Sequence, residues 1–260
     1  MGYGPQVIDL HAHVLPGLDD GARTLDESAE ILARAAHEGV TAVAATPHVR
    51  HDFPTRPEQM EEGVASVRSE LDARGIPLTL LPGGELDYEE LAVRTPEEVI
   101  RFALAGNARY LLVEFPYVGW PLRLPSEVER LLAAGIVPVL AHPERNSTVG
   151  ERPLMLAPLV EAGAIVQLTA SSVTGALGKR VRRVAQELLD ARLVHLIATD
   201  LHAPALGRAG LAAAAAAVSD ESLSRWLVQE VPAAIVNDTP LPPRPLPARE
   251  RRRRPSIRRG

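Results

Sequence analysis

The sequence contains no cysteine, which excludes disulfide bonds, zinc–thiolate sites and a cysteine nucleophile. Any hydrolysis by this chain must therefore use a metal ion, a hydroxyl group or a carboxylate. Long apolar runs are missing too: the longest, residues 211–218, is far shorter than the roughly 20 residues that span a bilayer. The first residues, MGYGPQVIDLHAH, lack the basic segment and apolar run of a signal peptide. We expect a soluble, cytoplasmic protein.

Seven apolar runs rich in β-branched residues recur along the first 200 residues and are predicted strands. They lie at residues 6–10, 40–45, 78–81, 110–114, 136–141, 164–169 and 194–199. Helical segments separate most of them, and this alternation is typical of a parallel sheet buried on both faces. With 260 residues, 46% of them hydrophobic, the chain can bury the core of one domain. We therefore predict an α/β fold, a single distorted (β/α)7 barrel over residues 1–239.

A doubly wound open sheet is the alternative architecture, but no GxGxxG motif follows the first predicted strand. Helix starts are predicted where Ser or Thr stands three residues ahead of Glu, the pattern of a capping box. These pairs are Thr24 with Glu27, Thr55 with Glu58, Thr95 with Glu98, and Ser126 with Glu129.

The last 20 residues differ from the rest in charge and in proline content. Residues 241–260 hold eight arginines and one glutamate, a charge of +7, so the net charge of −5 leaves −12 on the remainder. Six prolines between positions 240 and 255 exclude a regular helix, and few apolar residues offset the entropy of ordering the segment. We predict that residues 240–260 form a disordered, basic C-terminal tail.

Nine polar residues stand where predicted strands end. They are His11, His13, Asp20, His48, Glu85, Glu114, His142, Asp200 and His202. The carboxyl ends of barrel strands form the face on which barrel active sites lie. Taken singly, His142 is typical of a structural histidine, and Glu114 or Asp200 of a helix cap or an arginine partner. Their joint occurrence on one face predicts a metal site.

Electrostatics favours this interpretation of the nine residues. Two carboxylates about 4 Å apart repel each other by roughly 4 kcal/mol at an effective dielectric constant of about 20. Divalent cations remove this repulsion, and neutral imidazoles serve as additional ligands. Nitrogen and oxygen ligands without sulfur suit manganese, iron or zinc, and carboxylates can bridge two ions.

The same residues carry a resemblance to a known family. The segments DLHAH, LPGLDDGARTLDES, ATPHVRHD, GGELDY, LLVEFP, VLAHPERN and IATDLHAP resemble motifs of the polymerase and histidinol phosphatase (PHP) superfamily. Within it they are most similar to the bacterial manganese-dependent protein-tyrosine phosphatases encoded with capsule and exopolysaccharide genes. The resemblance runs from about residue 7 to residue 237. HxH followed by LDDG and HPER is far more specific than HxH alone, which many barrel hydrolases share.

The resemblance implies a site of three manganese ions at the mouth of a (β/α)7 barrel, held by the nine residues named above. It implies hydrolysis of phosphotyrosine by a metal-activated hydroxide. Arg145 of HPER matches an arginine that contacts the substrate phosphate, and Arg208 is a second candidate for this role. The implied partner is a bacterial tyrosine kinase that controls capsule and exopolysaccharide synthesis, with phosphotyrosines in its C-terminal tail.

Other residues of the motifs receive supporting roles or none. Asp19, which precedes the matched aspartate, is expected to form a turn or to support a ligand. His37, His51 and His195 match no ligand position, and we expect a surface or core role for His37 and His195.

Three alternatives stay open. A histidinol phosphatase or another small-molecule PHP phosphoesterase would share the metal cluster. An amidohydrolase is disfavoured, since many members need a carboxylated lysine where this chain has Glu114, and the sole lysine is Lys179. A different class is a non-catalytic module that binds nucleic acid or anionic lipid through the basic tail. We expect no DNA binding and at most weak contact with anionic membranes, and a homo-oligomer is left open.

Overall fold

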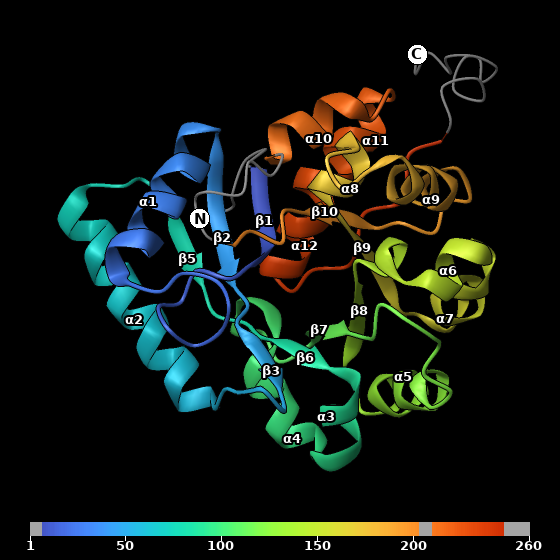
Figure 1. The fold of residues 1–260 in the computed structure, drawn as a ribbon, viewed down its shortest axis with the longest axis horizontal. Coiled ribbons are helices and arrows are strands. Elements are labelled where there is room, and N and C mark those ends of the chain that lie inside the picture. Colours follow the sequence, from blue (N-terminus) through green and yellow to red (C-terminus); the bar gives the residue numbers. More distant parts are fainter. Residues whose placement is uncertain (1–6, 203–209, 247–260) are drawn as a thin grey trace, which may run out of the picture.

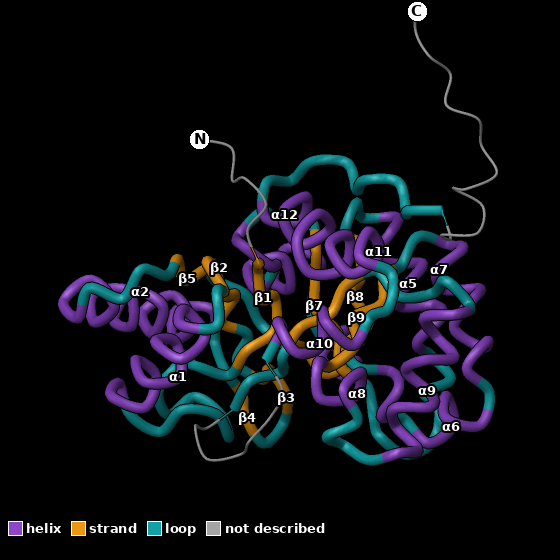
Figure 2. Tube along the Cα trace, turned by 90° about the horizontal axis from the view of Figure 1, so that it is seen from above, coloured by secondary structure: helices purple, strands orange, loops and turns teal. Residues whose placement is uncertain are grey.

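The computed structural model describes residues 7–202 and 210–246 of the 260-residue chain. Parallel strands lie at its centre, and helices surround them (Figures 1 and 2). One sheet has the strand order β1-β2-β5, with bounds Val7–Ala12, Val40–Ala45 and Thr79–Leu81. The other has the order β10-β9-β8-β7-β6-β3-β4, with bounds Leu196–Ala198, Ile165–Thr169, Val137–Ala141, Tyr110–Glu114, Glu85–Asp87, His48–Arg50 and Phe53–Pro54. All named pairs are parallel except β3 with β4.

The two sheets together form a distorted barrel. Strand β2 continues into β3 across Thr46 and Pro47, and β5 continues into β6 across residues 82–84, so each pair behaves as one interrupted strand. Closure occurs beside β1, where the Leu201 carbonyl accepts from the His13 amide at 2.7 Å and the Asp200 amide donates to the His11 carbonyl at 2.9 Å. The predicted α/β barrel is thereby confirmed, and the predicted strands correspond to β1, β2, β5, β7, β8, β9 and β10.

A buried carboxylate supports this closure. Asp9 of β1 accepts a hydrogen bond from the Thr199 amide at 3.0 Å and another from the Thr199 hydroxyl. Burial raises the pKa of Asp9, and the hydrogen bonds from Thr199 oppose that effect. The first strand, β1, and the segment that follows the last strand, β10, are thus joined by side-chain as well as backbone hydrogen bonds.

Helices cover the outside of the strands. They are α1 (Leu25–His37), α2 (Pro57–Arg74), α3 (Tyr88–Val93), α4 (Pro96–Val99), α5 (Leu124–Ala133), α6 (Ser147–Glu151), α7 (Ala157–Ala162), α8 (Ala170–Thr174), α9 (Lys179–Asp190), α10 (Leu211–Ala217), α11 (Glu221–Arg225) and α12 (Val231–Val236). Short 3-10 turns are η1 (Ile100–Phe102), η2 (Leu104–Gly106), η3 (Pro143–Arg145) and η4 (Pro153–Leu156), and η6 (Trp226–Glu230) is a π-helix. In the described part of the chain, no helix is long and apolar enough to cross a membrane.

Two of the four predicted helix starts are confirmed. Thr24 caps α1 by accepting from the Glu27 amide at 3.2 Å, and Thr95 forms a full capping box with Glu98. The other two predictions are wrong, since α2 begins at Pro57 and α5 at Leu124. In both helices a proline lies in the first turn, where its fixed φ and missing N–H favour a helix start. Helix α2 begins one residue later than a Thr55 cap predicts, and α5 begins three residues earlier than a Ser126 cap predicts.

The C-terminal segment corrects part of the tail prediction. Residues 240–246, which we expected to be disordered, contact the barrel with irregular backbone. The Trp226 indole donates to the Pro242 carbonyl at 3.0 Å, and Arg244 donates to the carbonyls of Arg192 at 3.1 Å and Val194. Proline prevents a helix here but leaves carbonyls free to accept these bonds. Residues 247–260 lie outside the described residues, and the predicted division at residue 240 stays a prediction.

His195 is expected to make the fold sensitive to acid. Its Nδ1 accepts from the Val166 amide at 3.1 Å, and burial, followed by the charge of Arg244, lowers its pKa to about 4. An unfolded histidine titrates near 6.5, so between these values only the unfolded chain binds the proton. The stability that neutral His195 contributes to the fold is fully present above pH 6.5 and decreases as the pH falls toward 4. Between pH 7 and pH 5 we expect a loss of roughly 2 kcal/mol in the free energy of unfolding.

Urea denaturation of the wild type and of His195→Asn at the two pH values measures this effect. Asn keeps an acceptor for the Val166 amide but does not titrate. The variant is expected to lose less stability on acidification than the wild type. An identical loss in both proteins would assign the acid sensitivity to other groups.

Candidate metal centre

All nine residues predicted to bind metal meet at the carboxyl ends of the strands. His11 lies on β1, His48 and Glu85 begin β3 and β6, and Glu114 ends β7. The others lie in the loops that follow β1, β8 and β10: His13, Asp20, His142, Asp200 and His202. Their nitrogen and oxygen atoms form four overlapping groups, in each of which the atoms lie within 4.8 Å of one another. The groups are His13–Asp20–His48–His202, His11–Glu85–His142, His11–His13–Asp200 and His48–Glu85–Glu114.

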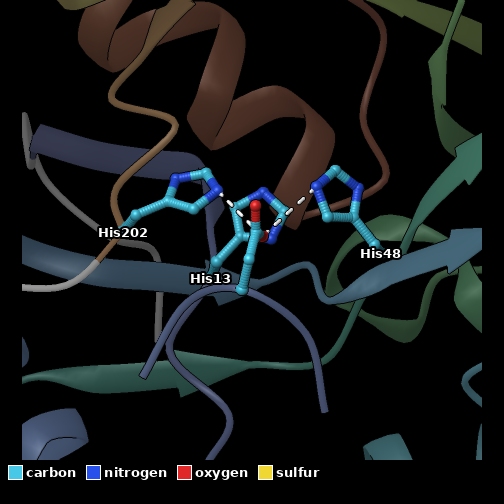
Figure 3. A group of neighbouring side chains, drawn as sticks. His13, His48 and His202 are labelled. Atoms are coloured by element: carbon cyan, nitrogen blue, oxygen red, sulfur yellow. Dashed lines mark ion pairs between the residues drawn. The ribbon is translucent and has the colours of Figure 1, made fainter. Parts of the chain in front are cut away.

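Figure 3 shows one group, in which the imidazoles of His13, His48 and His202 converge from different elements. The ring centroid of His13 lies 4.1 Å from that of His202 and 4.4 Å from that of His48. Oδ1 of Asp20 lies 3.3 Å from Nε2 of His202 and 3.6 Å from Nε2 of His48. Burial, then the neighbouring His13, lowers the pKa of His202 to about 4, so its imidazole is neutral at neutral pH and available as a ligand.

Glu85 belongs to two of the three remaining groups and is fully buried. Its Oε2 lies 3.2 Å from Nε2 of His11 and 3.0 Å from Nδ1 of His48, and its Oε1 lies 2.9 Å from Nε2 of His142. Burial alone would raise the pKa of Glu85, but His11 and the other imidazoles lower it well below its usual range. Both carboxylate oxygens thus face several nitrogens, as expected of a carboxylate that bridges cations.

Two buried polar atoms of this centre indicate whether a metal ion fits there. Oε2 of Glu85 and Nδ1 of His48 are buried and form no hydrogen bond, although they lie 3.0 Å apart. A buried polar atom without a hydrogen bond is costly in free energy. A cation bound by both atoms would satisfy them, so the donor set fits divalent metal ions.

The electrostatics of the centre favours positive charge. Burial would lower the pKa of His13, but hydrogen bonds to Asp19 and Asp200 raise it well above its usual value. Asp200 shows the reverse: burial would raise its pKa, but His11 and His13 lower it strongly. The buried carboxylates therefore attract cations, whether protons on imidazoles or metal ions.

Asp19 supports the centre through hydrogen bonds, as expected. Its Oδ2 lies 2.6 Å from Nδ1 of His13 and accepts from the His48 amide at 3.0 Å. Burial raises its pKa, but the hydrogen bond to His13 lowers it to about 2. Gly21 completes the turn, because a Cβ at this position would lie 2.1 Å from the His13 carbonyl oxygen. These contacts explain why the LDDG segment has an aspartate at position 19 and a glycine at position 21.

Gln167 was missed at the sequence level. It lies in the buried strand β9, and its Oε1 is 3.1 Å from Nδ1 of His11 and accepts from the His142 amide at 3.3 Å. A fixed partner on one ring nitrogen orients the other nitrogen toward the ligand position. The signal in the sequence was a single polar residue inside the apolar run that forms β9.

The backbone of the site carries strain at two of the nine residues. His142 has φ 34° and Asp200 has φ 53°, which place both in the left-handed region. This conformation costs of order 1–2 kcal/mol for a residue other than glycine. The left-handed conformation occurs where β8 and β10 end, and it changes the direction in which the side chains of His142 and Asp200 point.

Among the described residues, Arg145 and Arg50 reach carboxylates of the centre. An Nη of Arg145 lies 2.5 Å from Oδ2 of Asp200, and its guanidinium lies 4.6 Å from the ring centroid of Tyr117. Arg50 lies 3.4 Å from Oε2 of Glu114 and 5.1 Å from the ring centroid of Phe53. Arg208, the second predicted phosphate contact, lies outside the described residues.

The remaining histidines lie apart from these groups. His37 on α1 and His51 between β3 and β4 are exposed. His195 bonds to the Val166 amide at the opposite ends of the strands. The two placements expected for His37 and His195 thus agree with the structure.

The barrel and the donors at its mouth define a metal-dependent α/β-barrel enzyme. Residues 7–234 match the family described as capsular polysaccharide synthesis, CpsB/CapC. The tyrosine-protein phosphatase YwqE of Bacillus subtilis is 34% identical over 202 residues, covering 75% of this chain and 77% of the relative. The putative tyrosine-protein phosphatase CapC of Staphylococcus aureus is 31% identical over 199 residues, with the same coverage. The chain belongs to the CpsB/CapC family.

The fold agrees with this assignment. A solved structure from the work on YwqE of Bacillus subtilis and CpsB of Streptococcus pneumoniae, described as unique metal-dependent tyrosine phosphatases, superposes with a TM-score of 0.81. The sequence identity is 30%, and the match covers 92% of this chain and 99% of that structure.

Proposed function

We propose that this chain is a metal-dependent protein-tyrosine phosphatase that acts in capsular polysaccharide synthesis. The observation that carries the proposal is the set of buried imidazoles and carboxylates at the barrel mouth, in a chain that matches the CpsB/CapC family over residues 7–234. The relatives that match are named tyrosine-protein phosphatases, which supports the same substrate class here.

The nine residues would hold the metal ions, and we propose manganese with three ions in all. Four overlapping groups of donors support more than one ion, since His11, His13, His48 and Glu85 are each shared by two groups. Iron and zinc are the alternatives that the same donors allow. Such ions, when bound, supply Lewis acidity toward the phosphate and activate water as the nucleophile.

The chain's own residues orient the substrate. Arg145 would donate two hydrogen bonds to phosphate oxygens, since guanidinium matches phosphate geometry and its present partner Asp200 is a proposed ligand. The leaving phenolate of tyrosine, with a pKa near 10, departs more readily than a serine alkoxide. A strong general acid is therefore less necessary, and the missing cysteine excludes a phosphocysteine intermediate. Arg208 stays a predicted second contact to the phosphate.

The partner that we propose is the phosphotyrosine-containing C-terminal tail of a bacterial tyrosine kinase that controls polysaccharide synthesis. A flexible tail can adjust its conformation to a site at the barrel mouth when it binds. Such a partner would place the chain in the cytoplasm, in agreement with the expectation from the sequence.

A comparison of substrates tests the proposal. The purified protein with manganese is expected to release phosphate from a phosphotyrosyl peptide with a kcat/KM at least about tenfold higher than from histidinol phosphate. Higher turnover of histidinol phosphate would favour the small-molecule phosphoesterase instead. Turnover of neither substrate by protein with measured metal content would refute the phosphatase.

The same assay tests the role of Arg145. We expect Arg145→Ala to lower kcat/KM roughly 100-fold, as for the loss of one donor to a developing charge, while metal content is retained. Arg23→Ala is the matched control, since Arg23 is exposed and pairs with Glu27 on the surface. Loss of metal in Arg145→Ala would instead mean that Arg145 supports the ligand Asp200.

A further inference from the structure

The loop between β7 and α5 exposes apolar side chains at the mouth of the barrel. Val118 is 80% exposed, Leu122 is 90% exposed and Tyr117 is 43% exposed, whereas most large apolar side chains of the described residues are buried. We call residues 116–123 the rim loop. From Pro116 to Leu122 it carries no charged residue, so an uncharged surface lies beside a centre rich in charge.

The rim loop is held in place by hydrogen bonds. The Asn146 side chain, which is buried, donates to the carbonyls of Pro116 at 2.5 Å and Gly119 at 2.7 Å. The Ser147 amide donates to the Tyr117 carbonyl at 2.7 Å. The backbone of the loop is therefore fixed by the residues that directly follow Arg145. Its exposed side chains are displayed on a built support, which is typical of a binding surface.

Tyr117 joins the rim loop to the metal centre. Its ring centroid lies 5.8 Å from that of His142 and 4.6 Å from the Arg145 guanidinium carbon. A phosphate held at Arg145 would place its aromatic substituent beside this ring. Val118, one of the exposed apolar residues, directly follows Tyr117 in the sequence.

We propose that the rim loop selects the peptide around the phosphotyrosine: Tyr117 contacts the substrate ring, and Val118 and Leu122 contact an apolar side chain near it in sequence. This inference rests on the proposed phosphatase function and specifies its substrate. A second copy of the chain is a poorer occupant, because three side chains cannot supply the roughly 800 Å² per partner that a stable interface buries. A peptide of a few residues needs only a patch of this size, and burial of apolar area would supply the affinity.

The test replaces Val118 and Leu122 by serine in one variant. Three substrates are compared: a phosphotyrosyl peptide with leucine on both sides, the same peptide with glycine on both sides, and p-nitrophenyl phosphate. The ratio of kcat/KM for the leucine peptide to kcat/KM for p-nitrophenyl phosphate is expected to fall about tenfold, mainly through KM. The ratio of kcat/KM for the glycine peptide to kcat/KM for p-nitrophenyl phosphate should change by much less.

The double variant Val93→Ser with Leu154→Ser is the control. These residues are 77% and 67% exposed on α3 and η4, so they match the lost apolar surface, and their replacement should leave both ratios at the wild-type value. An unchanged ratio in the rim variant would overturn the proposal, as would equal losses on all three substrates. A change from dimer to monomer in size-exclusion chromatography would assign the loop to an interface between copies. Wild-type protein that hydrolyses p-nitrophenyl phosphate but neither peptide would refute the proposed function itself.

Discussion

Removing divalent ions with a chelator is expected to lower phosphotyrosine hydrolysis at least about 1000-fold, and adding manganese is expected to restore it. The ions contribute several kcal/mol to the stabilisation of the transition state, and each 1.4 kcal/mol is a factor of ten in rate. Without them, Glu85 and Glu114 both remain beside His48, at 3.0 and 3.6 Å from its Nδ1. A cysteine nucleophile is not available to replace them, since the sequence has no cysteine.

Metal analysis of the same samples makes this result interpretable. Turnover should follow metal content during titration, and restoration with manganese, iron or zinc in turn identifies the ion that supports the highest rate. The chelated protein should also unfold at a lower temperature, because a ligand that binds only the folded state stabilises it. Full activity in protein shown to hold no metal would exclude the proposed mechanism.

The barrel could be predicted because its strands are continuous apolar runs. β2 and β7 have the predicted bounds, and the other five predicted strands differ from observed ones by a few residues. The short strands β3 and β6 were missed for a physical reason. Each begins with a polar residue of the metal centre, His48 or Glu85, after a break that contains proline. A strand that exposes its side chains to a metal site loses the apolar pattern by which strands are recognised.

The ligands could be predicted, but their supporting contacts could not. HxH, LDDG and HPER are local patterns, whereas Gln167 contacts His11 across 156 positions of sequence, and Asp9 contacts Thr199 across 190. Nothing near a buried glutamine on a strand indicates which ring nitrogen it will meet. Arg244 contacts Arg192 and Val194 across 52 and 50 positions, which is also non-local, so composition alone predicted disorder for that segment.

Replacing His142 by alanine is expected to reduce turnover at least about 100-fold and to lower the bound metal content. Its Nε2 lies 2.9 Å from Oε1 of Glu85 and 3.7 Å from Oε1 of Glu114, so the variant loses a nitrogen donor between two carboxylates. Loss of one positioned ligand removes several kcal/mol of metal affinity and transition-state stabilisation. Asp200→Ala should behave alike, because Asp200 contributes an oxygen to the group with His11 and His13.

The matched control is His37→Ala, since His37 is exposed on α1 and belongs to none of the four donor groups. It should keep wild-type turnover and metal content. The two measurements together separate the possible roles of His142. Loss of both turnover and metal identifies a ligand, whereas loss of turnover with full metal content would give His142 a role in substrate contact. Wild-type turnover in His142→Ala would show that the metal centre does not need His142. The left-handed backbone at the end of β8 would then have no functional explanation.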